Sequence, residues 1–257
     1  MSVIGSAKGL LREAVDRLTV RLGLGHSEER LAHDARSYWA QTNAPNWRGN
    51  SHFQDADVFT KVDWTSVGTG HWELFSKLAG PEVSLNRIVE WGCGGGTNAV
   101  AFAPHCREFI GVDVNRDSLA ECARQVGDAT AFTGVEADLT NPEAAVAQIG
   151  EVDLFLCLYV LELVPSPDYG LRLMRIAHSL LRPGGLAFVQ IKYQTADWRT
   201  APRRHRYRES VAASMTTYPI DIFWTQMAAL GLTPLSCHLV PHNNLDHRYA
   251  YYLLRKA

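Results

Sequence analysis

The sequence lacks the features of secreted, disulfide-bonded and membrane-spanning proteins. Its five cysteines are scattered, odd in number and form no C-x-x-C pair, which is typical of reduced thiols in a cytoplasmic protein. No apolar run approaches the roughly 20 residues that a membrane helix needs. The amino-terminal stretch lacks the apolar core of a signal peptide, because acidic residues interrupt its pattern. These absences predict a soluble, cytoplasmic protein with no membrane partner.

The sequence also lacks an excess of charge of either sign. It has 25 lysines and arginines against 27 acidic residues, which gives a formal net charge of −2. Without a global positive field, nucleic acid is disfavoured as a partner. One local exception is an arginine-rich stretch that could hold a phosphate, a carboxylate or a nucleic-acid backbone, or could be a solvated loop. Its members are Arg199, Arg203, Arg204, Arg206 and Arg208.

Short apolar runs alternate with helical ones from residue 86 onward. Each run has the composition of a strand that is buried on both faces. Repeated strand–helix alternation predicts a parallel sheet with right-handed crossovers, which binds ligands beyond the carboxyl ends of its strands. The predicted strands are 87–91, 108–114, 131–137, 152–160 and 185–193, and the helices between them lie near 97–104, 116–126, 142–149 and 168–181.

The two ends of the chain follow other patterns. Apolar residues at helical spacing precede the first strand, and an irregular basic stretch follows the fifth. Near the carboxyl terminus, two strand-like runs are separated by the turn-prone pair Asn243-Asn244, which predicts an antiparallel hairpin. The predicted helices are 7–22, 28–41, 64–78 and 220–230, and the hairpin strands are 232–242 and 247–256.

A glycine-rich loop follows the first predicted strand, in the stretch Glu90-Trp91-Gly92-Cys93-Gly94-Gly95-Gly96. Glycines between a strand and a helix let the backbone turn tightly and approach a ligand closely. The dinucleotide pattern G-x-G-x-x-G would place its third glycine at position 97, where this chain has Thr97. A carboxylate at Glu90 would repel a pyrophosphate but could hold an ammonium group, directly or through water. The loop therefore favours a cationic ligand.

Acidic residues after the next two strands suit an adenosine. Asp113 ends the second strand, 21 positions after Gly92, where an acid can accept both ribose hydroxyls. Asp138 follows the third strand and could accept a hydrogen bond from the adenine amino group, with apolar neighbours on either side of the ring. By themselves these acids indicate only adenosine, and helix capping is their alternative role.

In this order, the motifs resemble those of the class I methyltransferases, which use S-adenosylmethionine. The similar stretches are E-W-G-C-G-G-G, G-V-D-V-N, E-A-D-L, V-L-E-L-V-P-S-P and L-L-R-P-G-G-L-A-F-V, between residue 86 and about residue 192. The resemblance implies an α/β fold with a Rossmann-like, mostly parallel seven-stranded sheet. An antiparallel carboxyl-terminal hairpin, helices on both faces and an amino-terminal helical cap complete the expected fold. We place the cap at 1–80, the cofactor-binding core at 81–257 and a substrate lid at 194–218.

The resemblance also implies S-adenosylmethionine as the cofactor. Glu90, Gly92, Gly94, Asp113 and Asp138 are expected to contact it, and Leu158 and Tyr159 to lie near the methyl donor. The full set of expected cofactor-binding residues is Glu90, Gly92, Cys93, Gly94, Gly96, Asp113, Val114, Ala137, Asp138, Leu139, Leu158 and Tyr159.

A general base is harder to place, because Leu163 stands where many small-molecule members of this family have a histidine. The candidates are Tyr159, Glu162, His71 and His242; for each, the alternative is a surface or hydrogen-bonded core residue. No cluster of acids indicates a magnesium site, so no metal is expected. A site built from the distant residues Asp197, His242 and Asp246 is left open.

The chain lacks the N/D-P-P-Y tetrapeptide of enzymes that methylate base or amide nitrogens, which favours an oxygen acceptor. Five aromatic residues before the first strand could line an acceptor pocket or pack in the core: Trp39, Trp47, Phe53, Trp64 and Trp72. We therefore expect O-methylation of a small metabolite such as a sugar or secondary metabolite, with a homodimer as an option. The alternatives are N-methylation of an amine metabolite or RNA, and a non-catalytic cofactor-binding module.

Overall fold

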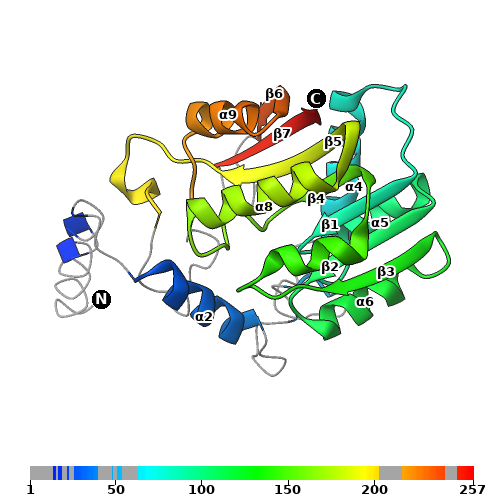
Figure 1. Cartoon of the computed structure of the whole chain (residues 1–257), viewed down its shortest axis with the longest axis horizontal. Helices are drawn as coiled ribbons and strands as arrows, with labels where there is room; N and C mark the ends of the chain where they lie inside the picture. Colours follow the sequence, from blue (N-terminus) through cyan, green and yellow to red (C-terminus); the bar gives the residue numbers. More distant parts are fainter. Residues whose placement is uncertain are drawn as a thin grey trace.

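A seven-stranded sheet forms the centre of the molecule (Figure 1). The computed structural model describes residues 14–15, 17–18, 22, 26–39, 48, 51–53, 63–202, 216–240 and 248–257. The strand order is β3-β2-β1-β4-β5-β7-β6, with β1 to β5 parallel and β7 antiparallel to both of its neighbours. The strands are β1 (Arg87–Trp91), β2 (Glu108–Asp113), β3 (Ala131–Glu136), β4 (Val152–Cys157), β5 (Leu181–Lys192), β6 (Leu232–Leu239) and β7 (Tyr249–Lys256). This sheet confirms the predicted fold class.

Two hydrophobic clusters cover the two faces of the sheet, because its central strands are apolar on both sides. One cluster joins the sheet to α7, α8 and α9, and the other joins it to α4, α5 and α6. The helices described are α2 (Glu28–Trp39), α4 (Trp64–Ala79), α5 (Thr97–Phe102), α6 (Arg116–Val126), α7 (Val146–Ile149), α8 (Pro167–Leu180) and α9 (Ile220–Ala229), with short 3-10 turns at Ala103–His105, Pro142–Ala145 and Trp198–Thr200. None of them is long and apolar enough to cross a membrane.

The helix before the sheet begins at the predicted residue and ends one residue later than predicted, for identifiable reasons. Asp63 caps α4, because its Oδ1 accepts the backbone N–H groups of Thr65 and Ser66 at 3.0 and 3.2 Å. Gly80, at φ +84°, ends the helix. Of the predicted helix over 7–22, only 14–15, 17–18 and 22 are described, and the first four are helical. The turn between β6 and β7, at 241–247, lies outside the described residues.

The end of β4 and the start of β5 differ from the sequence prediction by three and four residues. β4 ends at Cys157 rather than at residue 160, because the backbone reverses at Tyr159, which has φ +57°. β5 begins at Leu181, which pairs with Val152 before a register shift. Gly184, which the prediction placed before the strand, therefore lies with Gly185 in an irregularity inside it.

Helix α2 lies beside the carboxyl ends of the parallel strands (Figure 1). Its apolar residues Leu31 and Ala35 pack against Leu139, which follows β3. Its last residue is also fixed, because the side-chain amide of Asn115 donates to the carbonyl of Trp39 at 2.8 Å. These contacts bring the amino-terminal region over the edge of the sheet where ligands bind in such folds.

Candidate active site

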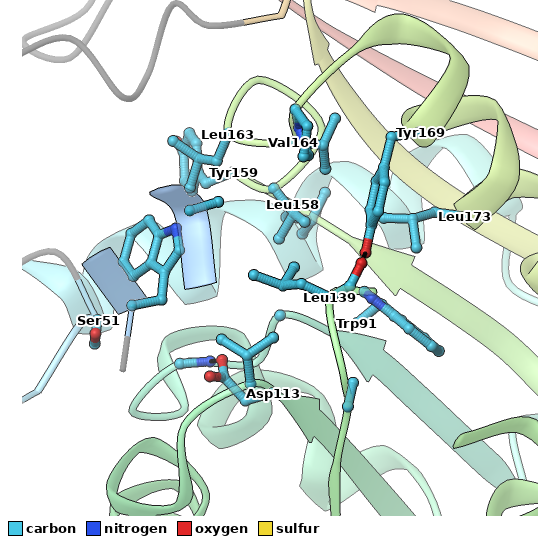
Figure 2. Close-up of a pocket in the computed structure, with 18 of the residues that line it drawn as sticks. Ser51, Trp91, Asp113, Leu139, Leu158, Tyr159, Leu163, Val164, Tyr169 and Leu173 are labelled. Carbon is cyan, nitrogen blue, oxygen red and sulfur yellow. Dashed lines mark hydrogen bonds between the residues drawn. The ribbon is translucent and has the colours of Figure 1, made fainter. Parts of the chain in front are cut away.

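A cavity lies beyond the carboxyl ends of the parallel strands, with about 780 Å³ of empty space when its open mouth is included. In Figure 2, Asp113 lies at its lower edge and Leu163 and Val164 at its upper edge. Three parts of the chain line it: the loops after β1, β2 and β3, the segment after β4 with the start of α8, and the amino-terminal residues Ala35, Trp39, Ser51 and His52.

The glycine loop is shaped by close contacts that only glycine allows. Gly92 and Gly94 have φ values of +75° and +51°. A Cβ atom on Gly92 would lie 2.3 Å from the side chain of Val160, and one on Gly94 would lie 2.7 Å from the carbonyl oxygen of Ser51. Both glycines line the cavity. The loop thus forms a concave surface, a glycine cradle, in which a ligand can approach the backbone closely.

Asp113 has the geometry of a hydroxyl acceptor. It lines the cavity, and its two carboxylate oxygens accept the backbone N–H groups of Gly94 and Asn115, each at 3.0 Å. Burial raises its pKa to about 6. Since each carboxylate oxygen can accept more than one hydrogen bond, the fixed carboxylate can still accept ribose hydroxyls.

Glu90 lies behind the cavity rather than in its lining. It is buried, and its Oε1 accepts the amide N–H of Asn98 at 2.6 Å. Within the described residues its Oε2 has no hydrogen-bond partner, and burial raises its pKa to about 8. An acidic side chain with an unused oxygen at the end of β1, directly before the glycine loop, can accept a hydrogen bond from the ammonium group of S-adenosylmethionine, so this part of the site fits that cofactor.

The other predicted cofactor residues divide into two groups. Val114, Ala137, Leu139, Leu158 and Tyr159 line the cavity. Cys93, Gly96 and Asp138 are not among the lining residues. Cys93 is buried, and a Cβ on Gly96 would lie 3.2 Å from Cys122. Asp138 is exposed and accepts hydrogen bonds from the N–H and the hydroxyl of Thr140, both at 2.8 Å, which keep its pKa below the usual value. A contact between Asp138 and adenine stays a prediction.

Of the candidate bases, His71 and Tyr159 lie close together, with 5.3 Å between their ring centroids. Tyr159 lines the cavity, whereas Glu162 and His71 are buried behind it. His242 lies outside the described residues, as does Asp246 of the alternative metal site. In the part of the chain that the structure describes, no group of three or more histidine, cysteine or acidic side chains could hold a metal ion.

Tyr159 is held in an unusual conformation. Its backbone has φ +57°, which is disfavoured for a bulky residue, and its N–H donates to Oε1 of the buried Gln190 at 2.7 Å. Its hydroxyl oxygen lies 3.3 Å from that of Tyr251. Burial raises the pKa of Tyr159 to about 12. The strain is maintained by these contacts, and it turns the side chain toward the cavity.

The sequence did not single out His52, which the structure places in the cavity lining. It has φ +60°, and its ring packs against that of Trp64, with 4.0 Å between the ring centroids and 34° between the ring planes. Burial lowers the pKa of His52 to about 4, with a smaller contribution from the nearby His71, so the ring is neutral. The aromatic crowding before β1 was a signal for this region but did not indicate a particular residue.

Of the remaining aromatic candidates, some line the cavity and others pack in the core. Trp39 lines the cavity, whereas Trp72 packs against Phe75 and Phe102 in the core. Phe53 is buried. Trp47 and the arginines from Arg203 to Arg208 lie outside the described residues.

Comparisons with known proteins show which family the chain resembles. A family model for a methyltransferase domain matches residues 88–185. The chain is 30% identical over 189 residues to the ubiquinone biosynthesis O-methyltransferase of Pseudomonas paraeruginosa, a match that covers 66% of this chain and 78% of that protein. It is 31% identical over 116 residues to the protein of the same name from Bordetella avium. That match covers 45% of this chain and 46% of the relative, so the chain spans about half the length of this protein.

A solved structure shares the fold. The N-methyltransferase NodS from Bradyrhizobium japonicum, in complex with S-adenosyl-L-homocysteine, superposes with a TM-score of 0.59 at 15% identity, covering 81% of this chain and 95% of that one. The strand order, the glycine loop and these matches define the class, and the chain belongs to the class I S-adenosylmethionine-dependent methyltransferases. Its cofactor is therefore S-adenosylmethionine.

Proposed function

We propose that this enzyme methylates a hydroxyl group of a small metabolite. The observation that carries the proposal is the Tyr159 hydroxyl, which lies on a strained residue of the cavity wall and is linked to a second hydroxyl behind it. S-adenosylmethionine supplies a methyl group on a sulfonium sulfur, and its transfer to a hydroxyl releases a proton that must be accepted. An amine that arrives neutral needs no such group during the transfer, so a positioned hydroxyl favours an oxygen acceptor.

The lining of the cavity supports an acceptor with a large apolar surface. Leu158, Leu163, Val164 and Leu173 contribute apolar side chains, and Figure 2 shows them grouped on one side. Such a lining suits an aromatic secondary metabolite better than an unmodified sugar. The relatives named ubiquinone biosynthesis O-methyltransferase give independent support for an oxygen acceptor.

We further propose that residues 1–80 act as a cap and 194–218 as a lid over a core at 81–257. The support for the cap is that Ala35, Trp39, Ser51 and His52 all line the cavity. Such a cap would exclude water from the cavity. Methyl transfer would be favoured, because water would no longer solvate the charged reactants in place of the protein.

An acceptor screen with label in the methyl group of S-adenosylmethionine tests the proposal. The panel contains substituted phenols and catechols, sugars, primary amines and a short RNA. We expect label on the oxygen of a phenol or catechol. Label on nitrogen alone would contradict the proposal, and cofactor binding without any product would favour a non-catalytic module.

A further inference from the structure

Helix α2 is fixed to the rim of the cavity at both of its ends. At its start, the hydroxyl of Ser166 donates a hydrogen bond to the carboxylate of Glu28. At its end, the side-chain amide of Asn115 donates to the carbonyl of Trp39 at 2.8 Å. Since Glu28 and Trp39 are the first and last residues of α2, these two hydrogen bonds hold the helix along its whole length.

The residues that contact α2 include those of the loops expected to bind adenosine. Asn115 lies two positions after Asp113, and its backbone N–H donates to the Asp113 carboxylate at 3.0 Å. Leu31 and Ala35 of α2 pack against Leu139, which lines the cavity after β3. Asp113 is the expected acceptor of the ribose hydroxyls, and the loop after β3 is expected to lie beside the adenine. Helix α2 is therefore attached to the adenosine end of the cofactor site.

Helix α2 also forms part of the cavity wall. Ala35 and Trp39 both line the cavity, together with Val114 and Leu139 from the loops after β2 and β3. A ligand at the adenosine end thus has α2 on one side and these loops on the other. An aromatic side chain such as Trp39 offers a large contact area. We therefore expect α2 and a bound adenosine to stabilise each other.

Asn115 connects α2 to the ribose site through separate atoms. Its side-chain oxygen accepts the N–H groups of Asp117 and Ser118 at 2.8 and 3.4 Å, which caps α6. Because these donors fix the oxygen side of the amide, its NH2 group faces the carbonyl of Trp39. Its backbone N–H is bonded to Asp113. Asn115 is buried, so water competes little for these hydrogen bonds.

We propose that α2 is a clasp that holds the adenosine end of the cofactor in the cavity, with Glu28 and Asn115 as the positioning residues that keep it closed. The clasp must open for S-adenosyl-L-homocysteine to leave after each methyl transfer and for fresh cofactor to enter. Each of the two hydrogen bonds therefore slows the release of the ligand. The inference rests on the cap proposed above, and it concerns the cofactor alone, so it does not depend on the acceptor.

The start of α2 offers a matched pair of variants. Glu28→Ala removes the partner of Ser166, whereas Glu29→Ala removes an exposed acid from the same turn of the helix. The two variants change the charge and the helix propensity of this turn equally. We expect the dissociation rate of labelled S-adenosyl-L-homocysteine to rise about three- to tenfold in Glu28→Ala, the effect of one hydrogen bond, and less than about twofold in Glu29→Ala. Equal rates in the two variants would overturn the proposal.

A second variant acts at the other end of α2. Asn115→Ser keeps a side-chain oxygen that can cap α6 and the backbone N–H bonded to Asp113, but it lacks the amide that donates to Trp39. We expect the same rise in the dissociation rate, about three- to tenfold. The control Asp63→Ser makes the equivalent exchange at the cap of α4 and should leave the rate unchanged. A lower unfolding temperature of Asn115→Ser with an unchanged dissociation rate would show a structural role alone and overturn the proposal.

A truncated ligand shows which end of the cofactor the clasp holds. 5′-Methylthioadenosine keeps the adenosine and the sulfur of S-adenosyl-L-homocysteine but lacks its amino acid end. Because α2 is attached to the adenosine end, Glu28→Ala and Asn115→Ser should weaken the binding of both ligands by the same factor in calorimetry. Weaker binding of S-adenosyl-L-homocysteine with unchanged binding of 5′-methylthioadenosine would place the clasp over the methionine end and overturn the proposal.

Amide hydrogen exchange of α2 in the full chain tests the coupling from the other side. By linkage, a ligand that α2 holds must in turn hold α2. We expect saturation with S-adenosyl-L-homocysteine to slow the exchange of α2 amides at least about tenfold, and to slow it less in Asn115→Ser. Exchange that is unchanged by the ligand would overturn the inference. If no hydroxyl in the screen is methylated, the proposed function fails, whereas the dissociation and exchange rates still decide the role of α2.

Discussion

The two walls of the cavity are built in different ways. The cofactor wall consists of residues at the ends of β1, β2 and β3, chiefly Gly92, Gly94 and Asp113, whose positions follow from backbone turns. The tyrosine wall consists of Tyr159 with Tyr251 behind it, which is 92 positions away in the chain. Neighbouring strand ends specify the first wall locally, whereas tertiary packing alone assembles the second. Variants of the two walls should therefore fail in different steps.

The largest expected effect comes from the cofactor wall. Gly94→Ala adds a Cβ that would meet the carbonyl oxygen of Ser51 at 2.7 Å in a backbone with φ +51°. Since backbone must move on both sides of this contact, we expect affinity for S-adenosyl-L-homocysteine to fall at least about hundredfold by calorimetry. The control is Gly80→Ala, which has φ +84° but no atom within 4 Å of the added carbon. Equal affinity in the two variants would contradict a glycine cradle.

A second prediction concerns Glu90, which lies between the two walls. Its pKa is raised from 4.5 to about 8, so between these values the folded protein keeps a proton that the unfolded chain has lost. The free energy of unfolding should therefore fall as the pH rises from 4.5 to 8. Glu90→Gln removes this decline, and we expect its stability advantage over the unchanged protein to grow with pH and level off above pH 8.

Urea unfolding at pH 6.5 and pH 8 isolates this effect. His52 and His71 have lowered pKa values, so their contribution is lost only as the pH falls from 6.5 toward 4. The difference in free energy between the two pH values should be on the order of 1–2 kcal/mol for a single group. Parallel stability curves for Glu90→Gln and the unchanged protein would show that Glu90 is ionised in the folded state.

The smallest expected effect is at His52, which lines the cavity. His52→Ala removes a ring that packs against Trp64 at a tilt of 34°. We expect KM for a methylated acceptor to rise by about three- to tenfold, the loss of one aromatic contact, with cofactor affinity unchanged. His105→Ala removes a histidine ring that stacks on Trp72 away from the cavity and should leave KM unchanged. A change in cofactor affinity alone would assign His52 to the cofactor wall.

The same contrast explains how far sequence reasoning could go. The strands, the glycine loop and Asp113 were predictable because each depends on residues close together in the chain. Tyr159 was a candidate by its place after β4, and His71 by its helix, but their connection through Tyr251 was not predictable. It depends on β7 returning antiparallel beside β5, which brings residues 180 positions apart into contact. Nothing in the local pattern of Asn98 or His52 marked either residue.

A crystal structure with S-adenosyl-L-homocysteine tests the central claim most directly. We predict that the ribose hydroxyls lie within hydrogen-bond distance of Asp113, with the sulfur on the side of the cavity formed by Leu158 and Tyr159. The amino end should lie over the glycine loop above Glu90. A ligand bound outside this cavity, or bound inside it with the sulfur turned away from Tyr159, would contradict the account.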